Sequence, residues 1–168
     1  MQRWILAGGV IAALASAEPA EAQGPGLLMG LAMGPSLTEF LAANPVGVGA
    51  VIKPEWRFSN GTGIGIGLRF LVYRGVPNHG LLFVELGRMA TSGTVRPVFA
   101  IRAGLFSGGD RGADDSYLGG QAGPLLGFEH PLSPDASLHV AGTLLATQAL
   151  HRDFRWVGGL EAGIRFHH

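Results

Sequence analysis

Apolar and polar residues alternate along most of the chain, and the pattern is clearest near the C-terminus. Between Phe154 and Phe166 every second residue is apolar or glycine, while charged residues, glycines and Val157 fill the positions between them. In an extended strand this period of two places the two sets on opposite faces. The same period recurs in earlier segments. The sequence therefore predicts eight strands, at residues 27–35, 46–58, 63–73, 82–86, 95–105, 117–129, 137–147 and 154–166.

The connectors between these strands alternate in character. Ser59-Asn60-Gly61, Ala90–Gly93 and Pro131–Asp135 have the composition of tight turns. The intervening connectors are mostly longer and are expected together at the opposite end, at residues 36–45, 74–78, 107–116 and 150–153. This order predicts an antiparallel up-and-down barrel.

Three prolines lie inside predicted strands. Pro54, Pro97 and Pro124 each lack a backbone N–H, so each removes one hydrogen bond from a strand ladder. We expect bulges or locally frayed pairing at these positions.

The first 22 residues have the pattern of a secretory signal peptide. Arg3 supplies the positive start, Trp4–Ala15 a short apolar core, and Ala20-Glu21-Ala22 a small-residue cleavage site. An earlier cut after Ala17 is the alternative. The apolar core is shorter than the roughly 20 residues that a spanning helix needs. The expected organisation is a signal peptide over residues 1–22 and one barrel domain over 23–168.

Composition narrows the classes of function. Twelve basic and twelve acidic residues give a formal net charge of +0, which offers no clustered basic surface for nucleic acid. There are no cysteines, so disulfides and thiolate metal sites are excluded. The histidines follow no metal-site spacing, and the glycines of 63–67 lack the G-K-[ST] ending of a phosphate loop. We expect no metal and no cofactor.

The residue composition of the two strand faces distinguishes a membrane barrel from a soluble one. After residue 22 no apolar run is long enough for a spanning helix, although 47% of the chain is hydrophobic, so alternating strands must account for this content. The polar face interleaves charges with many glycines, which suits the narrow interior of an eight-stranded barrel. The apolar face carries aromatics near both ends, as expected at membrane interfaces: Trp56, Phe58, Phe128 and Phe166 near one end, and Phe40, Phe70, Phe106, Phe154 and Trp156 near the other. The alternative is a lipocalin-like carrier with its apolar face turned inward.

With these features the chain resembles the small eight-stranded outer-membrane β-barrel proteins of Gram-negative bacteria. The resemblance covers residues 27–166 by pattern, and it includes the terminal strand with Leu160, Ala162, Ile164 and Phe166. His167 and His168 depart from the family pattern, in which the aromatic residue is usually last. The resemblance implies an all-β transmembrane barrel in the bacterial outer membrane after export, surrounded by outer-membrane lipids and lipopolysaccharide. It also implies recognition of the C-terminal strand by the barrel-assembly machinery.

The predicted inward face collects charges of both signs. Unpaired buried charges cost several kcal/mol, so we expect ion pairs that fill the lumen. The alternative is a gate or narrow pore opened by rearrangement of these partners. The predicted lumen set is Lys53, Glu55, Arg57, Arg69, Glu85, Arg96, Arg102, Glu129, Arg155, Glu161 and Arg165.

An enzymatic function is the third alternative, because some barrels of this class are lipid A deacylases or acyltransferases. Ser137 and His139 share the inward face, with Glu129 or Glu161 as a candidate orienting carboxylate. The deacylase pattern, however, places histidine before serine, and the pair is expected near the periplasmic end, away from outer-leaflet lipid. The sequence favours a non-enzymatic envelope structural or surface-interaction protein, with no catalytic residues.

Overall fold

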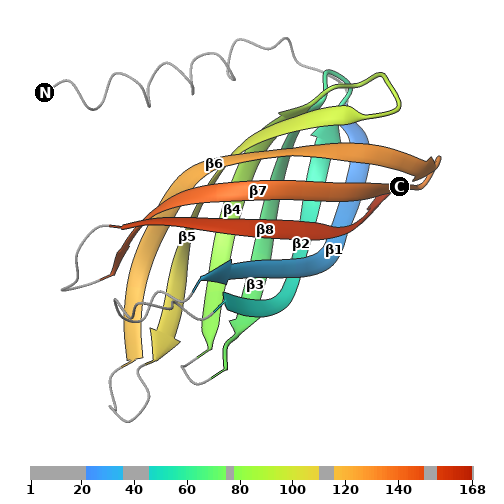
Figure 1. Cartoon of the computed structure of the whole chain (residues 1–168). Helices are drawn as coiled ribbons and strands as arrows, with labels where there is room; N and C mark the ends of the chain where they lie inside the picture. Colours follow the sequence, from blue (N-terminus) through green and yellow to red (C-terminus); the bar gives the residue numbers. More distant parts are fainter. Residues whose placement is uncertain (1–21, 36–45, 75–77, 110–115, 150–154, 168) are drawn as a thin grey trace, which may run out of the picture.

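A computed structural model shows one closed barrel of eight antiparallel strands (Figure 1). It describes residues 22–35, 46–74, 78–109, 116–149 and 155–167. Each strand pairs with the next along the chain, and the last strand pairs with the first to close the barrel. The strands are β1 (Ala22–Pro35), β2 (Val46–Phe58), β3 (Thr62–Val72), β4 (His79–Met89), β5 (Arg96–Gly109), β6 (Ser116–Ser133), β7 (Ala136–Ala149) and β8 (Arg155–His167). The predicted fold class is confirmed.

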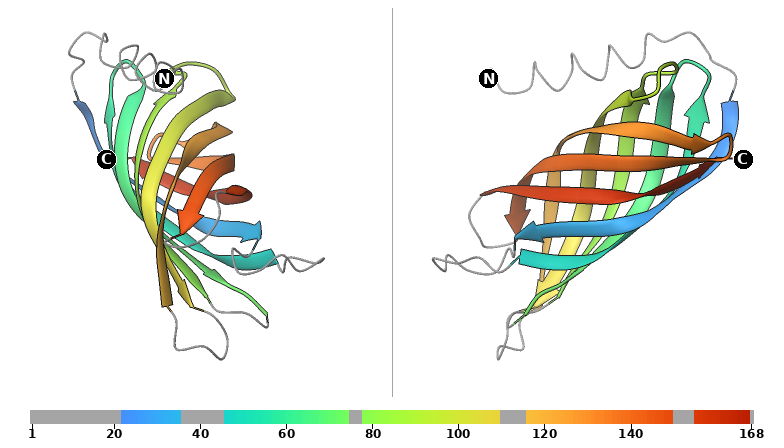
Figure 2. Two further views of the ribbon diagram at one scale, coloured as in Figure 1. Left: turned by 90° about the vertical axis from the view of Figure 1, so that its left-hand side faces the viewer. Right: turned by 45° about the vertical axis from the view of Figure 1, so that its right-hand side comes forward.

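The barrel has two distinct ends. At one end, here called the turn end, short turns join β2 to β3, β4 to β5 and β6 to β7, and β8 finishes beside them (Figures 1 and 2). The connectors at the turn end span residues 59–61, 90–95 and 134–135. Those at the opposite end, the loop end, span 36–45, 73–78, 110–115 and 150–154 and are longer on average, although 90–95 is as long as two of them. Strands on opposite walls cross at a large angle in both figures, as the tilted strands of a closed barrel must. Among the described residues no helix is long and apolar enough to span a membrane.

Two turns use glycine where the backbone requires it. Gly61 has φ of 81° and Gly93 has φ of 101°, a region that residues with a Cβ rarely adopt. In the first turn the N–H of Gly61 donates to the carbonyl of Phe58 at 2.9 Å, and the N–H of Thr62 donates to Asn60 Oδ1 at 2.9 Å. The predicted hairpin at residues 59–61 is therefore present.

Apolar side chains cover the outside of the barrel, and polar side chains point into its lumen. In β3, Ile66 and Leu68 are 51% and 56% exposed, whereas Arg69 is 4% exposed. The other strands follow the same alternation in their described residues. This is the reverse of a soluble protein, in which the apolar face is buried.

The lumen is narrow enough that aromatic rings lie directly on glycines of neighbouring strands. A Cβ at Gly67 would overlap the ring of Phe83, and a Cβ at Gly119 would overlap the ring of Phe106. Phe83 and Phe106 are each 1% exposed. Glycine on the inward face therefore makes room for large side chains opposite it, as small barrels require.

Phe106 corrects one prediction about the aromatic residues. It was expected on the apolar exterior near the loop end, but it is buried in the lumen. It shares the inward face of β5 with Arg102, because the two residues are separated by an even number of positions. This parity is visible in the sequence and contradicts the exterior assignment.

Pro54 and Pro124 each interrupt one ladder without shifting its register. Between β2 and β3 the pairs Ile52↔Leu68 and Glu55↔Gly65 keep one register, and the positions around Pro54 between them are unpaired. The β6–β7 ladder has the same gap at Pro124. Pro97, the second residue of β5, pairs with Phe128 in continuous register, so the expected bulge or frayed pairing at Pro97 is wrong. Frayed pairing at Pro54 and Pro124 is confirmed, and a bulge at either site is wrong.

We predict that Gly67→Ala destabilises the barrel by about 1–3 kcal/mol, because the new methyl group would overpack the lumen against Phe83. Urea titration of the refolded protein measures this loss of stability, and the folded fraction is determined from the protein's mobility on gels run without heating. Gly142→Ala is the matched control, since a Cβ there has no heavy atom closer than 3.8 Å. Phe83→Leu should partly rescue the Gly67→Ala variant, and equal stability of the two alanine variants would contradict this account.

Candidate functional site: a charge network in the lumen

Arg102 is the centre of the charged lumen. Its Nε and Nη2 donate to Glu85 Oε2 at 3.1 and 2.7 Å, a carboxylate on the adjacent strand β4. Its Nη1 and Nη2 also donate to Glu161 Oε1 and Oε2 at 2.5 and 2.8 Å. Because Glu161 lies on β8, which is no neighbour of β5, these bonds cross the lumen. The guanidinium also lies 3.9 Å above the ring centroid of Phe83, and Arg102 is fully buried.

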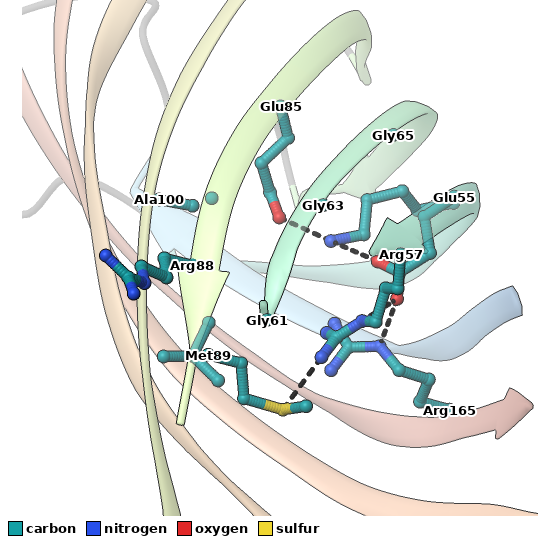
Figure 3. Close-up of a pocket in the computed structure, with 13 residues that line it drawn as sticks. Glu55, Arg57, Gly61, Gly63, Gly65, Glu85, Arg88, Met89, Ala100 and Arg165 are labelled. Atoms are coloured by element: carbon teal, nitrogen blue, oxygen red, sulfur yellow. Dashed lines mark hydrogen bonds and ion pairs between the residues drawn. The ribbon is translucent and has the colours of Figure 1, made fainter. Parts of the chain in front are cut away.

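Lys53 extends the network from Glu85 to β2. Its ammonium group bonds to Glu85 and lies 3.2 Å from Glu55 Oε2. Lys53 therefore pairs with both carboxylates. Figure 3 labels Glu55 and Glu85, with Gly63 and Gly65 of β3 near them. A Cβ at Gly65 would lie 3.0 Å from the Lys53 side chain. The absence of a side chain on β3 therefore leaves the space in which the lysine lies.

Two arginines continue the network toward the turn end. Glu55 Oε1 accepts from Arg57 Nε at 2.7 Å and lies 2.7 Å from Arg165 Nε (Figure 3). Both arginines also reach Glu129, Arg57 Nη2 at 3.4 Å and Arg165 through Nη1. The Arg165 contacts are ion pairs without good hydrogen-bond direction. Glu55 and Glu129 are thus each held between two arginines.

The network ends on a serine and a histidine at the turn end. Ser137 Oγ donates to Glu129 Oε1 at 2.6 Å and lies 2.9 Å from His167 Nε2. The N–H of His167 donates to the carbonyl of Asp135 at 2.9 Å. His167, which departs from the family pattern, is therefore part of β8 and of this polar cluster. His168 lies outside the described residues.

Arg69 is the least well paired cation of the network. Its Nη1 lies 3.6 Å from Glu161 Oε1, and its buried Nε has no hydrogen-bond partner among the described residues. Gln121 and Thr143 also have buried polar atoms without partners in the described part of the chain. Buried groups of this kind are ordinarily satisfied by internal water. The network is therefore tightly paired around Arg102 and loosely paired at Arg69.

Apolar residues fill much of the lumen that the charges leave. One inward cluster, toward the loop end, consists of Ala32, Val51, Leu71, Tyr73, Leu81, Phe83 and Phe106. A second cluster, toward the turn end, consists of Met89, Val98, Ala100, Leu125 and Ala141. The cavity shown in Figure 3, beside Lys53 and Glu55, has a volume of only about 20 Å³. A cavity of this volume holds about one water molecule.

Most of the predicted lumen charges belong to one connected network. From the loop half to the turn end it runs through Arg69, Glu161, Arg102, Glu85, Lys53, Glu55, Arg57, Arg165 and Glu129. Arg96 is separate, because it is partly exposed and its Nε donates to the carbonyl of Gly93 at 3.3 Å. The side chain of Arg155 lies outside the described residues.

The sequence prediction omitted the apolar part of the lumen and two polar members of the network. Val51, Leu71 and Leu81 were not assigned to the inward face, although each lies an even number of positions from a predicted inward charge. Ser137 is placed on the inward face near Glu129 by the strand period, but its membership of the charge network, like that of His167, depends on contacts between strands.

Apart from Phe106, the predicted interface aromatics that the structure describes point outward, and Phe40 and Phe154 lie outside the described residues. Trp56, Phe128 and Phe166 are exposed toward the turn end, and Phe70 and Trp156 toward the loop end. Phe58 is partly exposed. Among the described residues they form two groups separated along the barrel.

Ser137 and His139 do not form a nucleophile and base. Ser137 donates its hydroxyl proton to Glu129, and the ring nitrogens of His139 have no hydrogen-bond partner among the described residues. His167 is the histidine beside Ser137, but its Nε2 is 3.6 Å from the same Glu129 oxygen that the serine occupies. A serine triad instead needs a carboxylate on the far nitrogen of the histidine.

Comparison with known structures gives the same fold. Neisserial surface protein A (NspA) aligns with a TM-score of 0.69 and 17% identity, covering 88% of this chain and 99% of that chain. Ail, the attachment invasion locus protein of Yersinia pestis, aligns with a TM-score of 0.55 and 14% identity, covering 86% and 98%. No protein-family model and no curated protein matches the sequence. The chain has the fold of the small eight-stranded outer-membrane barrels, as the sequence pattern predicted.

We predict that Glu161→Gln lowers the free energy of unfolding by about 3–5 kcal/mol, because it leaves Arg102 and Arg69 buried without their shared carboxylate. Urea unfolding of the refolded protein is the measurement. Arg88→Gln removes an exposed charge outside the network and should change stability by less than about 0.5 kcal/mol. Adding Arg102→Met to Glu161→Gln should recover part of the loss. Additive losses would show that the two side chains are not coupled.

Proposed function

We propose that this protein is an integral outer-membrane barrel with a closed lumen, serving as an envelope structural or surface-interaction protein without enzymatic activity. The single observation that carries the proposal is the inversion of polarity described above. The outer face of the barrel is apolar, and its lumen contains a connected ion-pair network. Such a surface is stable in hydrocarbon, where a closed barrel satisfies every strand hydrogen bond.

Both ends of the barrel support an orientation across the membrane. Short turns typically face the periplasm in such barrels, and longer loops face outward. This arrangement places the turn end, with Trp56, Phe128 and Phe166, at the inner interface. Phe70 and Trp156 then lie at the outer interface. Signal-directed export through residues 1–22, which lie almost entirely outside the described residues, belongs to the same proposal.

Two kinds of partner follow from this placement. The exposed apolar face of the strands contacts outer-membrane lipids, with lipopolysaccharide around the loop end. The outward residues Leu160, Ala162, Ile164 and Phe166 of β8 carry the pattern that the assembly machinery recognises in the family the chain resembles. In the finished barrel β8 pairs with both β1 and β7, so its edges are available only before closure.

A closed lumen is favoured over a pore because both charges and apolar side chains occupy it. Conduction would require the Arg102 bonds to two carboxylates to be exchanged for water. The carrier alternative needs a dry apolar cavity inside the barrel, and the described lumen is instead filled. The bonding of Ser137 gives no support to a lipid hydrolase.

Fractionation tests the proposed location. The protein expressed with residues 1–22 should be recovered with outer membranes, require detergent for extraction, and change its gel mobility on heating as the barrel unfolds. A maltose-binding periplasmic protein in the same cells is the soluble control. Recovery with the soluble periplasmic fraction would contradict the proposal and favour the carrier.

A further inference from the structure

A cavity of about 390 Å³ lies at the turn end of the barrel, and its volume is within the range of small-molecule sites. Arg57 and His167 line it, and each lies two positions from a network residue on its own strand, so both point inward from the strand ends. Gly24 and Gly26, at the beginning of β1, line it without contributing side chains. The β6–β7 turn borders it through Asp135. The cavity is therefore the mouth of the lumen at the turn end.

Arg57 directs one hydrogen-bond donor at a weak acceptor in this cavity. Its Nε and Nη2 donate to the carboxylates of Glu55 and Glu129, but its Nη1 donates to the sulfur of Met89 at 2.8 Å (Figure 3). Met89 also lines the cavity. A thioether sulfur is a weak acceptor. An anionic oxygen that enters the cavity is a much stronger partner for the same N–H group.

Arg96 stands at the rim of the cavity, outside the network. Its Nε donates to the carbonyl of Gly93 at 3.3 Å, and its two Nη groups have no hydrogen-bond partner among the described residues. Arg96 belongs to β5 and Arg57 to β2, so the two guanidinium groups reach the cavity from strands that are not neighbours. A ligand that fills the cavity therefore contacts both arginines, from two sides.

The net charge of the lumen also favours an anion at this mouth. In the described network five cations face four carboxylates, so one positive charge is in surplus, and Arg96 adds another at the rim. Low-dielectric walls focus such a field toward the opening. Asp135 is the one acid in the described lining of the cavity, and it is exposed to solvent. The cations of the network are Lys53, Arg57, Arg69, Arg102 and Arg165, and its carboxylates are Glu55, Glu85, Glu129 and Glu161.

We propose that the turn-end cavity binds one phosphate group between Arg57 and Arg96, either as the free ion or as the phosphate of a small organic ester. A phosphate group carries a charge of about −1.5 to −2 at neutral pH and has three strong acceptor oxygens. It can accept from arginines on two sides, whereas a carboxylate presents only two oxygens in one plane. The volume of the cavity leaves room for an organic group attached to the phosphate.

This inference goes beyond the proposed function, because it assigns a ligand to the barrel. In the proposed orientation the turn end faces the periplasm, so the phosphate comes from that side. The binding itself depends only on the folded barrel, and it is measured in detergent without reference to the location of the protein in the cell.

Isothermal titration calorimetry of the refolded protein in a nonionic detergent tests this, with glycerol phosphate, inorganic phosphate and uncharged glycerol as the three probes. The unmodified protein should bind one phosphate group per barrel and no glycerol. Arg96→Gln should weaken phosphate binding about tenfold, because it removes charge-assisted donors. Asp135→Asn should strengthen it about threefold, because it removes a negative charge beside the anion. Arg88→Gln is the matched control and should bind like the unmodified protein, since Arg88 is exposed and is not part of the cavity lining.

Tighter binding of glycerol phosphate than of inorganic phosphate supports the site with an organic ester as its ligand, and the opposite order or equal binding supports it with the free ion. Absence of phosphate binding by the folded protein would overturn the proposal, as would equal weakening by Arg96→Gln and Arg88→Gln, which indicates non-specific attraction to surface charge.

Heat-dependent gel mobility of each sample shows that its barrel is folded. If the glutamine variant does not fold, Arg96→Lys replaces it and should bind severalfold more weakly than the unmodified protein, because lysine keeps the charge but lacks the planar pair of donors. Folded protein that binds no phosphate refutes the site alone, whereas the proposed function is decided separately by membrane fractionation.

Discussion

The double engagement of Arg102 with Glu85 and Glu161 is the interaction on which the rest of the interior depends. A fully buried guanidinium is tolerated only when its charge and its N–H donors are matched. Here one carboxylate comes from the neighbouring strand and the other from across the lumen. The arginine therefore links opposite walls of the barrel. Glu85 also pairs with Lys53, and Glu161 also pairs with Arg69, so both carboxylates extend the network.

Because the interior is filled in this way, the positions of the glycines depend on the positions of the long charged and aromatic side chains. The lumen of eight strands has little spare volume, so a long side chain on one strand needs a missing one nearby. Gly65 leaves space for Lys53, and Gly67 leaves space for Phe83, which in turn lies under Arg102.

Strand number, pairing order and most of the inward charges could be predicted from the sequence, because the period of two fixes the face of each residue; Arg96 is the exception among the described charges. Leu68 and Arg69 were assigned to opposite faces by parity alone, and the structure agrees. Which charged side chains form ion pairs with each other could not be predicted from the period of two. The Arg102–Glu161 contact joins β5 to β8, and the tilt and stagger of the strands set the height at which they meet. Phe106 was misassigned because aromatic character was weighed above its parity with Arg102.

Planar-bilayer recording of the refolded, unmodified protein tests the central claim, that paired charges and apolar side chains close the lumen. The account predicts no steady current at any moderate voltage, because the mid-lumen space beside Lys53 holds about one water molecule. A reproducible unitary conductance from the folded protein would contradict it and would show that the Arg102 pairs open to water.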